Sequence, residues 1–279
     1  ADLEAILEPL VRNGFLVLEG RNVSFVHDRV REAAHTLMTD DERSSNHLVL
    51  GRALLRDHTI IGDAEYTIPA VLNPVMHLLN PAERLELARL NLAAGSRARS
   101  GGAFSEAGRY FSQGYSLIED ANWDTDYELS FALALGLAES SYLNEEHAKA
   151  VDLFQVCSGR ARDPLDSARV QELRALLLLS EGKLSEAIDA GLTGLDTLGI
   201  RLPRHPGQMG PLPDLIACRL WFVRRKIEDL SHLKDASDSR IQAAMHLMMI
   251  IGNAAFIGRP ALVPVVIARM VRISLRYGF

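Results

Sequence analysis

Residues 92–111 read LAAGSRARSGGAFSEAGRYF, and their small side chains predict two antiparallel helices joined by a glycine turn. Gly95 stands in the first helix, Gly102 at the turn, and Ala107 and Phe111 in the second helix. Gly and Ala let two helices pack at a short axial distance, so we interpret Gly95 and Ala107 as the contact points of the pair. Each such pair leaves an apolar face that a neighbouring pair must cover.

The same pattern recurs twice further along the chain. The second copy is Ala138, Glu145, His147, Ala150 and Phe154, and the third is Ala175, Gly182, Leu184, Ala187 and Gly191. The pattern resembles the tetratricopeptide repeat, a helix pair of about 34 residues with small residues at these contacts. Glu145 at a turn and Gly191 in place of an aromatic depart from that family. The alternative is an irregular helical bundle in which alanine recurs by composition.

The composition favours helices packed on helices. Of 279 residues, 48% are apolar and only 6% aromatic, which allows a sizeable core and argues against an all-β fold. The net charge of −6 gives no field that attracts polyanions, so neither nucleic acid nor an acidic membrane is an expected partner. The uncharged run 241–258 contains His246 and Asn253, and we expect it to be a buried helix. Cys157 and Cys218 lack a CxxC spacing, which predicts buried thiols and a cytoplasmic protein.

The N-terminal residues predict a helix, a β-hairpin and a second helix. Two β-rich runs, 15–18 and 23–26, flank a turn at Gly20, and Asp28 is expected to cap the following helix. This order is typical of the end of a winged-helix domain. Three further helix starts are predicted by cap signals at Thr39, Asn80 and Asp163.

These observations predict an all-α chain with one hairpin, organised in four parts. Residues 1–39 are the C-terminal part of a winged-helix domain, 40–200 tetratricopeptide-like repeats, 201–213 a Pro/Gly-rich loop, and 214–279 further, truncated helix pairs. The loop is interpreted as a connection between helix pairs, the alternative being a peptide-binding polyproline segment. Because the chain opens at Ala1 without an initiator Met, we expect it to be an excerpt from a longer protein.

The residues contain no complete set of catalytic groups. Phosphate-binding loops, zinc-binding HExxH and the GxSxG elbow are all absent from the sequence, so we expect no enzyme activity and no metal site in this fragment. His246 lies in apolar helical sequence, and we interpret it as a hydrogen-bonded core histidine; Met245, Met248 and Met249 are interpreted as core packing.

A run of cations beside aromatics, Trp221 to Lys226, is the strongest candidate for a nucleic-acid contact. Glu228 and Asp229 follow within a turn, so an exposed, mixed-charge helix face explains the run more simply. Arg21 and Arg29 beside the hairpin are too few for a DNA-binding wing.

His27 and Asp28, at the junction of the hairpin and the next helix, are the candidate site. An imidazole held at a strand end can donate a hydrogen bond to a phosphate oxygen of a neighbouring domain. On spacing alone, the simpler interpretation is that His27 fills a turn.

The stretch FVHDRVREAAH, residues 25–35, resembles a segment of the STAND-type signalling ATPases of bacterial multidomain proteins. Further resemblance lies in residues 84–88, 160–166 and 198–206. Proteins of that group often begin with a protein kinase domain, followed by an AAA-like ATPase with a winged helix. Tetratricopeptide-like repeats come next, and a histidine kinase or cyclase module comes last. The resemblance implies that His27 and Asp28 sense the β-phosphate of ADP bound to an adjoining ATPase domain, so ADP or ATP is a cofactor of the parent protein only.

We therefore expect a non-catalytic sensor and scaffold region of a cytoplasmic signalling ATPase or kinase. Its repeats are expected to present a concave face to a protein, peptide or small-molecule signal. The alternatives are a stand-alone tetratricopeptide adaptor that binds peptides and the repeat arm of a transcription regulator.

Overall fold

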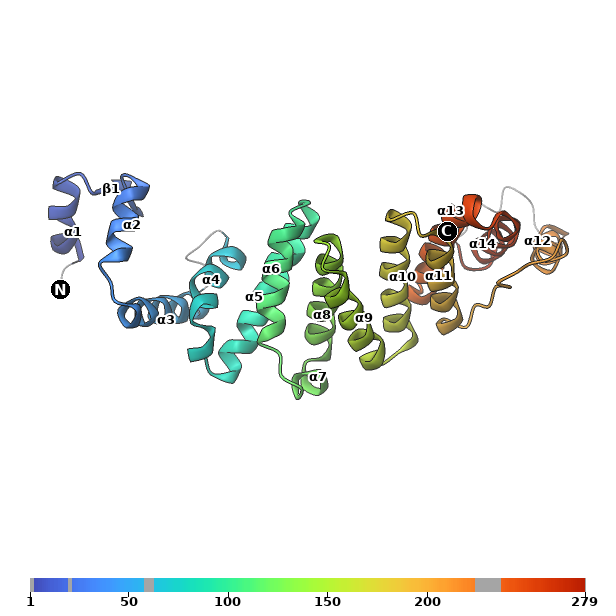
Figure 1. Ribbon diagram of the computed structural model, residues 1–279, viewed down its shortest axis with the longest axis horizontal. Helices are drawn as coiled ribbons and strands as arrows, with labels where there is room; N and C mark the ends of the chain where they lie inside the picture. The colour runs from blue at the N-terminus through green and yellow to red at the C-terminus, as the bar shows by residue number, and fades with distance from the viewer. Residues whose placement is uncertain (1–2, 20–21, 58–62, 224–236, 279) are drawn as a thin grey trace. The chain divides into compact units, whose positions relative to one another are not determined.

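The computed structural model describes residues 3–19, 22–57, 63–223 and 237–278, and it has an all-α helical repeat fold (Figure 1). The chain divides into two compact units, Ala1–Leu90 and Asn91–Phe279. Within the described residues the one sheet is a two-stranded hairpin. The predicted fold class is confirmed, whereas the predicted domain boundaries stay a prediction.

The first unit begins with the predicted helix, hairpin and helix. Its elements are α1 (Leu3–Arg12), β1 (Leu16–Glu19), β2 (Asn22–Phe25), α2 (Asp28–Thr36), α3 (Asp40–Arg56), α4 (Ala64–Leu72), a 3₁₀ helix (Asn73–Leu78) and the start of α5 (Pro81–Ser100). The strands are antiparallel, with Leu16 opposite Phe25. The hairpin turn at Gly20 and Arg21 lies outside the described residues.

The second unit consists of helix pairs. Its elements after α5 are α6 (Phe104–Ser116), α7 (Asn122–Thr125), α8 (Tyr127–Leu143), α9 (His147–Arg160), α10 (Pro164–Ser180), α11 (Leu184–Thr197), α12 (Leu212–Val223), α13 (Ser239–Gly258), a 3₁₀ helix (Pro260–Leu262) and α14 (Val263–Tyr277). Helices α8 and α9 pack together, as do α10 and α11 (Figure 1). The predicted continuation of α12 beyond Val223 falls outside the described residues.

Side-chain caps fix three helix starts where the sequence predicts them. Thr39 and Glu42 form a reciprocal capping box, with the Thr39 amide donating to the Glu42 carboxylate at 2.8 Å. Asn80 and Glu83 exchange the same two bonds at 3.0 Å. Asp163 accepts hydrogen bonds from the amides of residues 165 and 166.

The same turn joins the helices of three successive pairs. Gly102, Glu145 and Gly182 adopt the left-handed conformation, with φ of 78°, 65° and 74°. In each case the next amide donates to the carbonyl five residues earlier: 103 to 98, 146 to 141 and 183 to 178, at 2.8–3.0 Å. This is the Schellman motif, which favours glycine because an L side chain is strained there. The repeat predicted from small residues therefore ends its first helices identically, even at Glu145.

Small residues let the helices approach one another closely. A Cβ on Gly95 would lie 2.7 Å from the Phe111 ring, and one on Gly136 would lie 2.9 Å from the same ring. Phe111 of α6 is fully buried between these two glycines of α5 and α8. Ala107, Ala150 and Ala187 are likewise fully buried in the second helix of each pair. Sterics thus set the spacing of the pairs.

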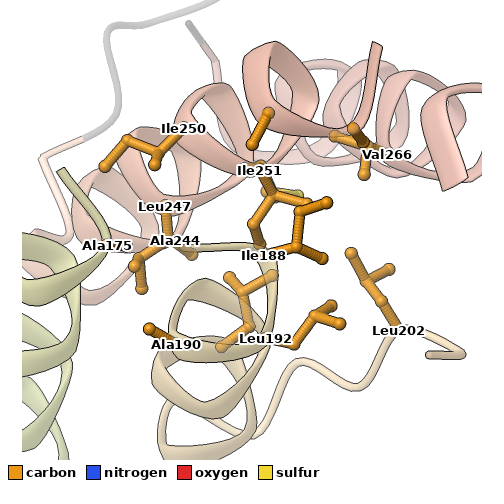
Figure 2. Close-up of a cluster of buried hydrophobic side chains, with 14 of the residues drawn as sticks. Ala175, Ile188, Ala190, Leu192, Leu202, Ala244, Leu247, Ile250, Ile251 and Val266 are labelled. Carbon is orange, nitrogen blue, oxygen red and sulfur yellow. The ribbon is translucent and has the colours of Figure 1, made fainter. Parts of the chain in front are cut away.

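The third pair lacks the aromatic because another helix fills its place. A Cβ on Gly191 would lie 2.5 Å from the Ile251 side chain of α13. Ile251 belongs to a core cluster in which Ile188 and Leu192 of α11 meet Leu247 of α13 (Figure 2). This cluster also takes in residues of α10 and α14, so the last two pairs share one core.

The Pro/Gly-rich loop is fastened to the second unit rather than acting only as a spacer. Leu202 is buried in the core cluster shown in Figure 2. Arg204 lies 3.5 Å from Asp189 of α11. At the end of the loop, the buried Asp214 carboxylate accepts from Arg269 at 2.9 Å and from Arg272 at 2.8 Å, both on α14. Charged side chains therefore attach α12 to α14.

Helix α13 is long and apolar enough to cross a membrane by length and composition alone. Its side chains Leu247, Met248 and Ile251 are fully buried against protein. Because a buried core helix passes the same test of length and composition, this helix is weak evidence for a membrane span.

Candidate binding groove

His27 and Asp28 lie at the junction of β2 and α2 and are both exposed. His27 is the N-cap residue of α2, with extended backbone (φ −141°, ψ 146°) and no side-chain cap bond. The prediction that Asp28 caps this helix is wrong: Asp28 is its first residue and pairs with Arg31 at 3.0 Å. The imidazole therefore faces solvent, and its proposed role in sensing nucleotide stays a prediction.

The second unit contains a cavity of about 330 Å³ on the first helices of three successive pairs, which we call the α5/α8/α10 groove. It is lined by Leu92, Ser96 and Arg99 of α5, Phe111 of α6, Ala132, Leu135, Gly136 and Glu139 of α8, and Arg169, Glu172, Leu173 and Leu176 of α10. Leucines form its walls and four charged side chains lie among them. Such a mixture of apolar wall and few polar groups is typical of binding sites.

The groove is built from the repeat itself. Three residues before the small residue of each first helix stand Leu92, Leu135 and Glu172, and one residue after it stand Ser96, Glu139 and Leu176. The predicted packing residues Gly95, Ala138 and Ala175 are buried beneath these positions. Equivalent positions of successive repeats thus line one surface.

An ion pair crosses the groove between α5 and α8. Arg99 donates from Nη1 to the Glu139 carboxylate at 2.5 Å, and the two side chains are 39% and 19% exposed. The Arg99 guanidinium also lies 5.9 Å from the centre of the Phe111 ring. Arg99 therefore contacts both Glu139 of α8 and the Phe111 ring, which packs against Gly95 and Gly136.

A second pair lies between α10 and α13. Glu172, whose side chain is 22% exposed, has its carboxylate 3.6 Å from Nδ1 of His246. Burial raises the pKa of Glu172 above its ordinary value, while His246 and Arg169 act in the opposite direction. Arg169 itself pairs at 3.4 Å with Asp166, a buried carboxylate that also accepts from Tyr127 at 2.6 Å.

The interpretation of His246 as a core residue is wrong. Its side chain is 61% exposed and faces Glu172. Of the methionines assigned to the core, Met245 and Met248 are buried, but Met249 is 55% exposed. His246 and Met249 lie three residues apart and so share one face of α13, opposite the buried Leu247 and Ile251. Sequence reasoning missed this face because α13 is apolar on both sides.

Two other predicted features differ in part from the structure. Cys157 is buried, as predicted, and burial raises the pKa of its thiol to about 12, whereas Cys218 is only partly buried. Trp221 begins the predicted cationic run, but residues 224–226 and the following acids lie outside the described residues. Within the described ranges, no group of three His, Cys, Asp or Glu side chains is arranged to hold a metal ion.

Comparison with known proteins finds one weak, partial similarity. Over 205 residues the chain is 24% identical to hybrid signal transduction histidine kinase G of Dictyostelium discoideum. The match covers 64% of this chain but only 6% of that kinase, so the chain spans a small part of its relative. No protein-family model matches the sequence. No solved structure matches it either.

Proposed function

We propose that this chain is a non-catalytic sensor and scaffold region of a multidomain signalling protein, and that the α5/α8/α10 groove binds a peptide segment. The observation that carries the proposal is the groove itself, in which equivalent positions of three successive helix pairs form one lined surface. Similarity to part of a signal transduction histidine kinase supports the signalling context. Stacked helix pairs suit this role because each repeat adds side chains to a common surface.

The finer part of the proposal concerns nucleotide. By resemblance to STAND-type ATPases with tetratricopeptide-like repeats, His27 is the group that contacts the β-phosphate of ADP in an adjoining ATPase domain. The exposed imidazole at an extended strand end supports this role, since it is free to donate a hydrogen bond to a phosphate oxygen. ADP or ATP would then belong to the parent protein, in the cytoplasm, and this region would carry no catalytic group.

The two parts combine in a switch. A segment bound in the groove shifts the balance between a closed, ADP-bound state and an open state only if it binds the two with different affinity. His27 would stabilise the closed state through the phosphate, and the groove would receive the signal.

The nucleotide part is tested in the full-length protein with His27→Ala. We expect its affinity for ADP to fall about tenfold, as for the loss of one charge-assisted hydrogen bond. His35→Ala, an exposed histidine on the same helix α2, is the matched control and should leave the affinity unchanged. Equal affinities of both variants and the natural protein would contradict nucleotide sensing and favour a plain adaptor.

The groove part is tested by placing a photo-cross-linking residue at Leu176, which is 45% exposed at the groove, and at Leu215 on α12, which is 51% exposed outside it. Both variants are irradiated with a library of synthetic peptides of about 13 residues, long enough to cross several helices at roughly 3.3 Å per residue. We expect cross-links at position 176 in excess of those at 215. Equal yields would overturn the groove as the binding surface.

A further inference from the structure

The two arginines that line the α5/α8/α10 groove each pair with a carboxylate, whereas Glu172 pairs with a histidine. Arg99 pairs with Glu139 at 2.5 Å, and Arg169 pairs with the buried Asp166 at 3.4 Å. Of the two arginines that line the groove, one is therefore paired inside it and the other with Asp166, which does not line it, so Glu172 is the lining carboxylate without an arginine ion pair. The one ion-pair partner that the described residues give Glu172 is His246, at 3.6 Å.

Histidine compensates a carboxylate only when the imidazole is protonated. The charge of Arg169 also acts on Glu172, but Arg169 makes its ion pair with Asp166 at 3.4 Å. An ion pair between Glu172 and a lysine or arginine is therefore left for a ligand to supply. The carboxylate is partly removed from water, so its attraction for a cation is stronger than that of a fully exposed carboxylate. An acidic ligand, by contrast, would have to compete with Glu139 and Asp166 for the arginines.

Apolar side chains surround this carboxylate. Leu173 and Leu176 are its neighbours on α10, and Ala132 and Leu135 face the same cavity from α8. Leu176 is 45% exposed, so part of this apolar surface is open to a ligand. A ligand that fills the groove must bring apolar groups on either side of its cation.

We propose that the groove selects a peptide segment in which a lysine or arginine is flanked by apolar residues, with the cation at Glu172 and the apolar side chains on Leu173 and Leu176. This inference rests on the proposed peptide-binding function. A long basic side chain suits the site, because its methylene stem can lie along the leucines while its charged end reaches the carboxylate.

The test uses a library of synthetic peptides whose central residue is Lys, Arg, norleucine or Glu and whose flanking positions vary among Leu, Ala and Ser. Norleucine keeps the stem of lysine without its charge. For the natural chain we expect Lys and Arg peptides to bind about tenfold more tightly than norleucine peptides, and Glu peptides to bind least. The preference should weaken in about 0.5 M NaCl because salt screens the pair.

Two variants locate the preference at Glu172. Glu172→Gln should abolish the difference between Lys and norleucine peptides, and His246→Lys should do the same by giving the carboxylate a permanent cation. Glu186→Gln, an exposed carboxylate on α11 outside the groove, is the control and should keep the difference. Circular dichroism of each variant shows whether it remains folded.

The outcomes separate this inference from the proposed function. Peptides that cross-link at position 176 without preference for Lys or Arg, or with the same preference in Glu172→Gln, would overturn the inference and leave peptide binding intact. Failure of every peptide class to bind at position 176 would overturn both.

Discussion

The described parts of residues 91–197 and 200–277 are both largely helical, and in the second region ion pairs between distant residues add to the apolar core. In the first region, buried small residues and three identical turns set the packing, as at Gly95 against Phe111. In the second region, a buried carboxylate fastens α12 to α14, and Arg259 joins Asp189 to the loop carbonyl of residue 204. Small residues at helix contacts recur at regular spacing and can be recognised in the sequence. Ion pairs between distant residues follow no such spacing.

The largest expected effect comes from removing the ring in the first region. Phe111→Ala should lower the free energy of unfolding by about 3–5 kcal/mol, because a fully buried ring between two glycines leaves a cavity that α5 and α8 cannot close. Urea denaturation measures the change. Phe104→Ala, at a 41% exposed position on the same helix, should cost less than about 1 kcal/mol. Similar losses in both variants would show that the ring does not set the spacing.

The next effect tests the second region. Asp214→Asn should lower the free energy of unfolding by about 2–3 kcal/mol, since it removes the negative charge between Arg269 and Arg272. The loss is below that of a fully buried pair because the arginines are 23% and 42% exposed and can reach water. Asp124→Asn, whose carboxylate is 88% exposed and pairs with Arg162, should cost at most about 0.5 kcal/mol. A neutral Asp214→Asn would mean that apolar packing holds both regions alike.

Substitutions at the shared turn should change the free energy of unfolding by a smaller amount, in opposite directions at Glu145 and Gly182. Glu145→Gly should raise the free energy of unfolding by about 1 kcal/mol, because Glu145 has φ of 65° where glycine is unstrained. Gly182→Ala should lower it by about 1 kcal/mol at the equivalent turn, where an added Cβ meets no atom within 4 Å and only backbone strain acts. Thermal unfolding of both variants measures the pair of changes. Changes of the same sign would refute the equivalence of the turns.

The smallest effect concerns Glu172 and its dependence on pH. Since burial raises its pKa in the folded chain, the natural protein should lose stability as pH rises through that folded pKa. Glu172→Gln should therefore be more stable than the natural chain at pH 7, by less than about 1 kcal/mol, and equal to it near pH 4. Urea denaturation at the two pH values tests this. A destabilised variant at pH 7 would show that His246 over-compensates the burial.

The fold was predictable where residue size sets the geometry. Gly102, Glu145 and Gly182 were aligned by their spacing from small residues, and all three occupy the same turn. The role of Gly191 was not predictable, because the side chain that fills its place, Ile251, is 60 residues away and comes from another pair. Asp214 and its two arginines were missed for the same reason.

The groove was predictable only in part. A binding face on the repeats was expected, but of the predicted packing residues only Phe111 lines the groove. Leu135 lies three residues before Ala138 and Glu139 one residue after it. The spacing from the small residue of each repeat could therefore have predicted these lining positions. The exposed face of α13 could not be predicted from the sequence, because apolar residues occur on both faces of this helix. Only the structure shows that Met248 is buried while Met249 is exposed.

The shared core of the last two helix pairs sets a limit on how the protein can be shortened. Ile188, Leu192 and Leu195 of α11 are fully buried, and the cluster that covers them includes Leu247 and Ile251 of α13. Ending the polypeptide after Thr197 would uncover these side chains and favour aggregation. A truncated chain that remains folded should therefore retain residues through α14, so that α10, α11, α13 and α14 are kept together.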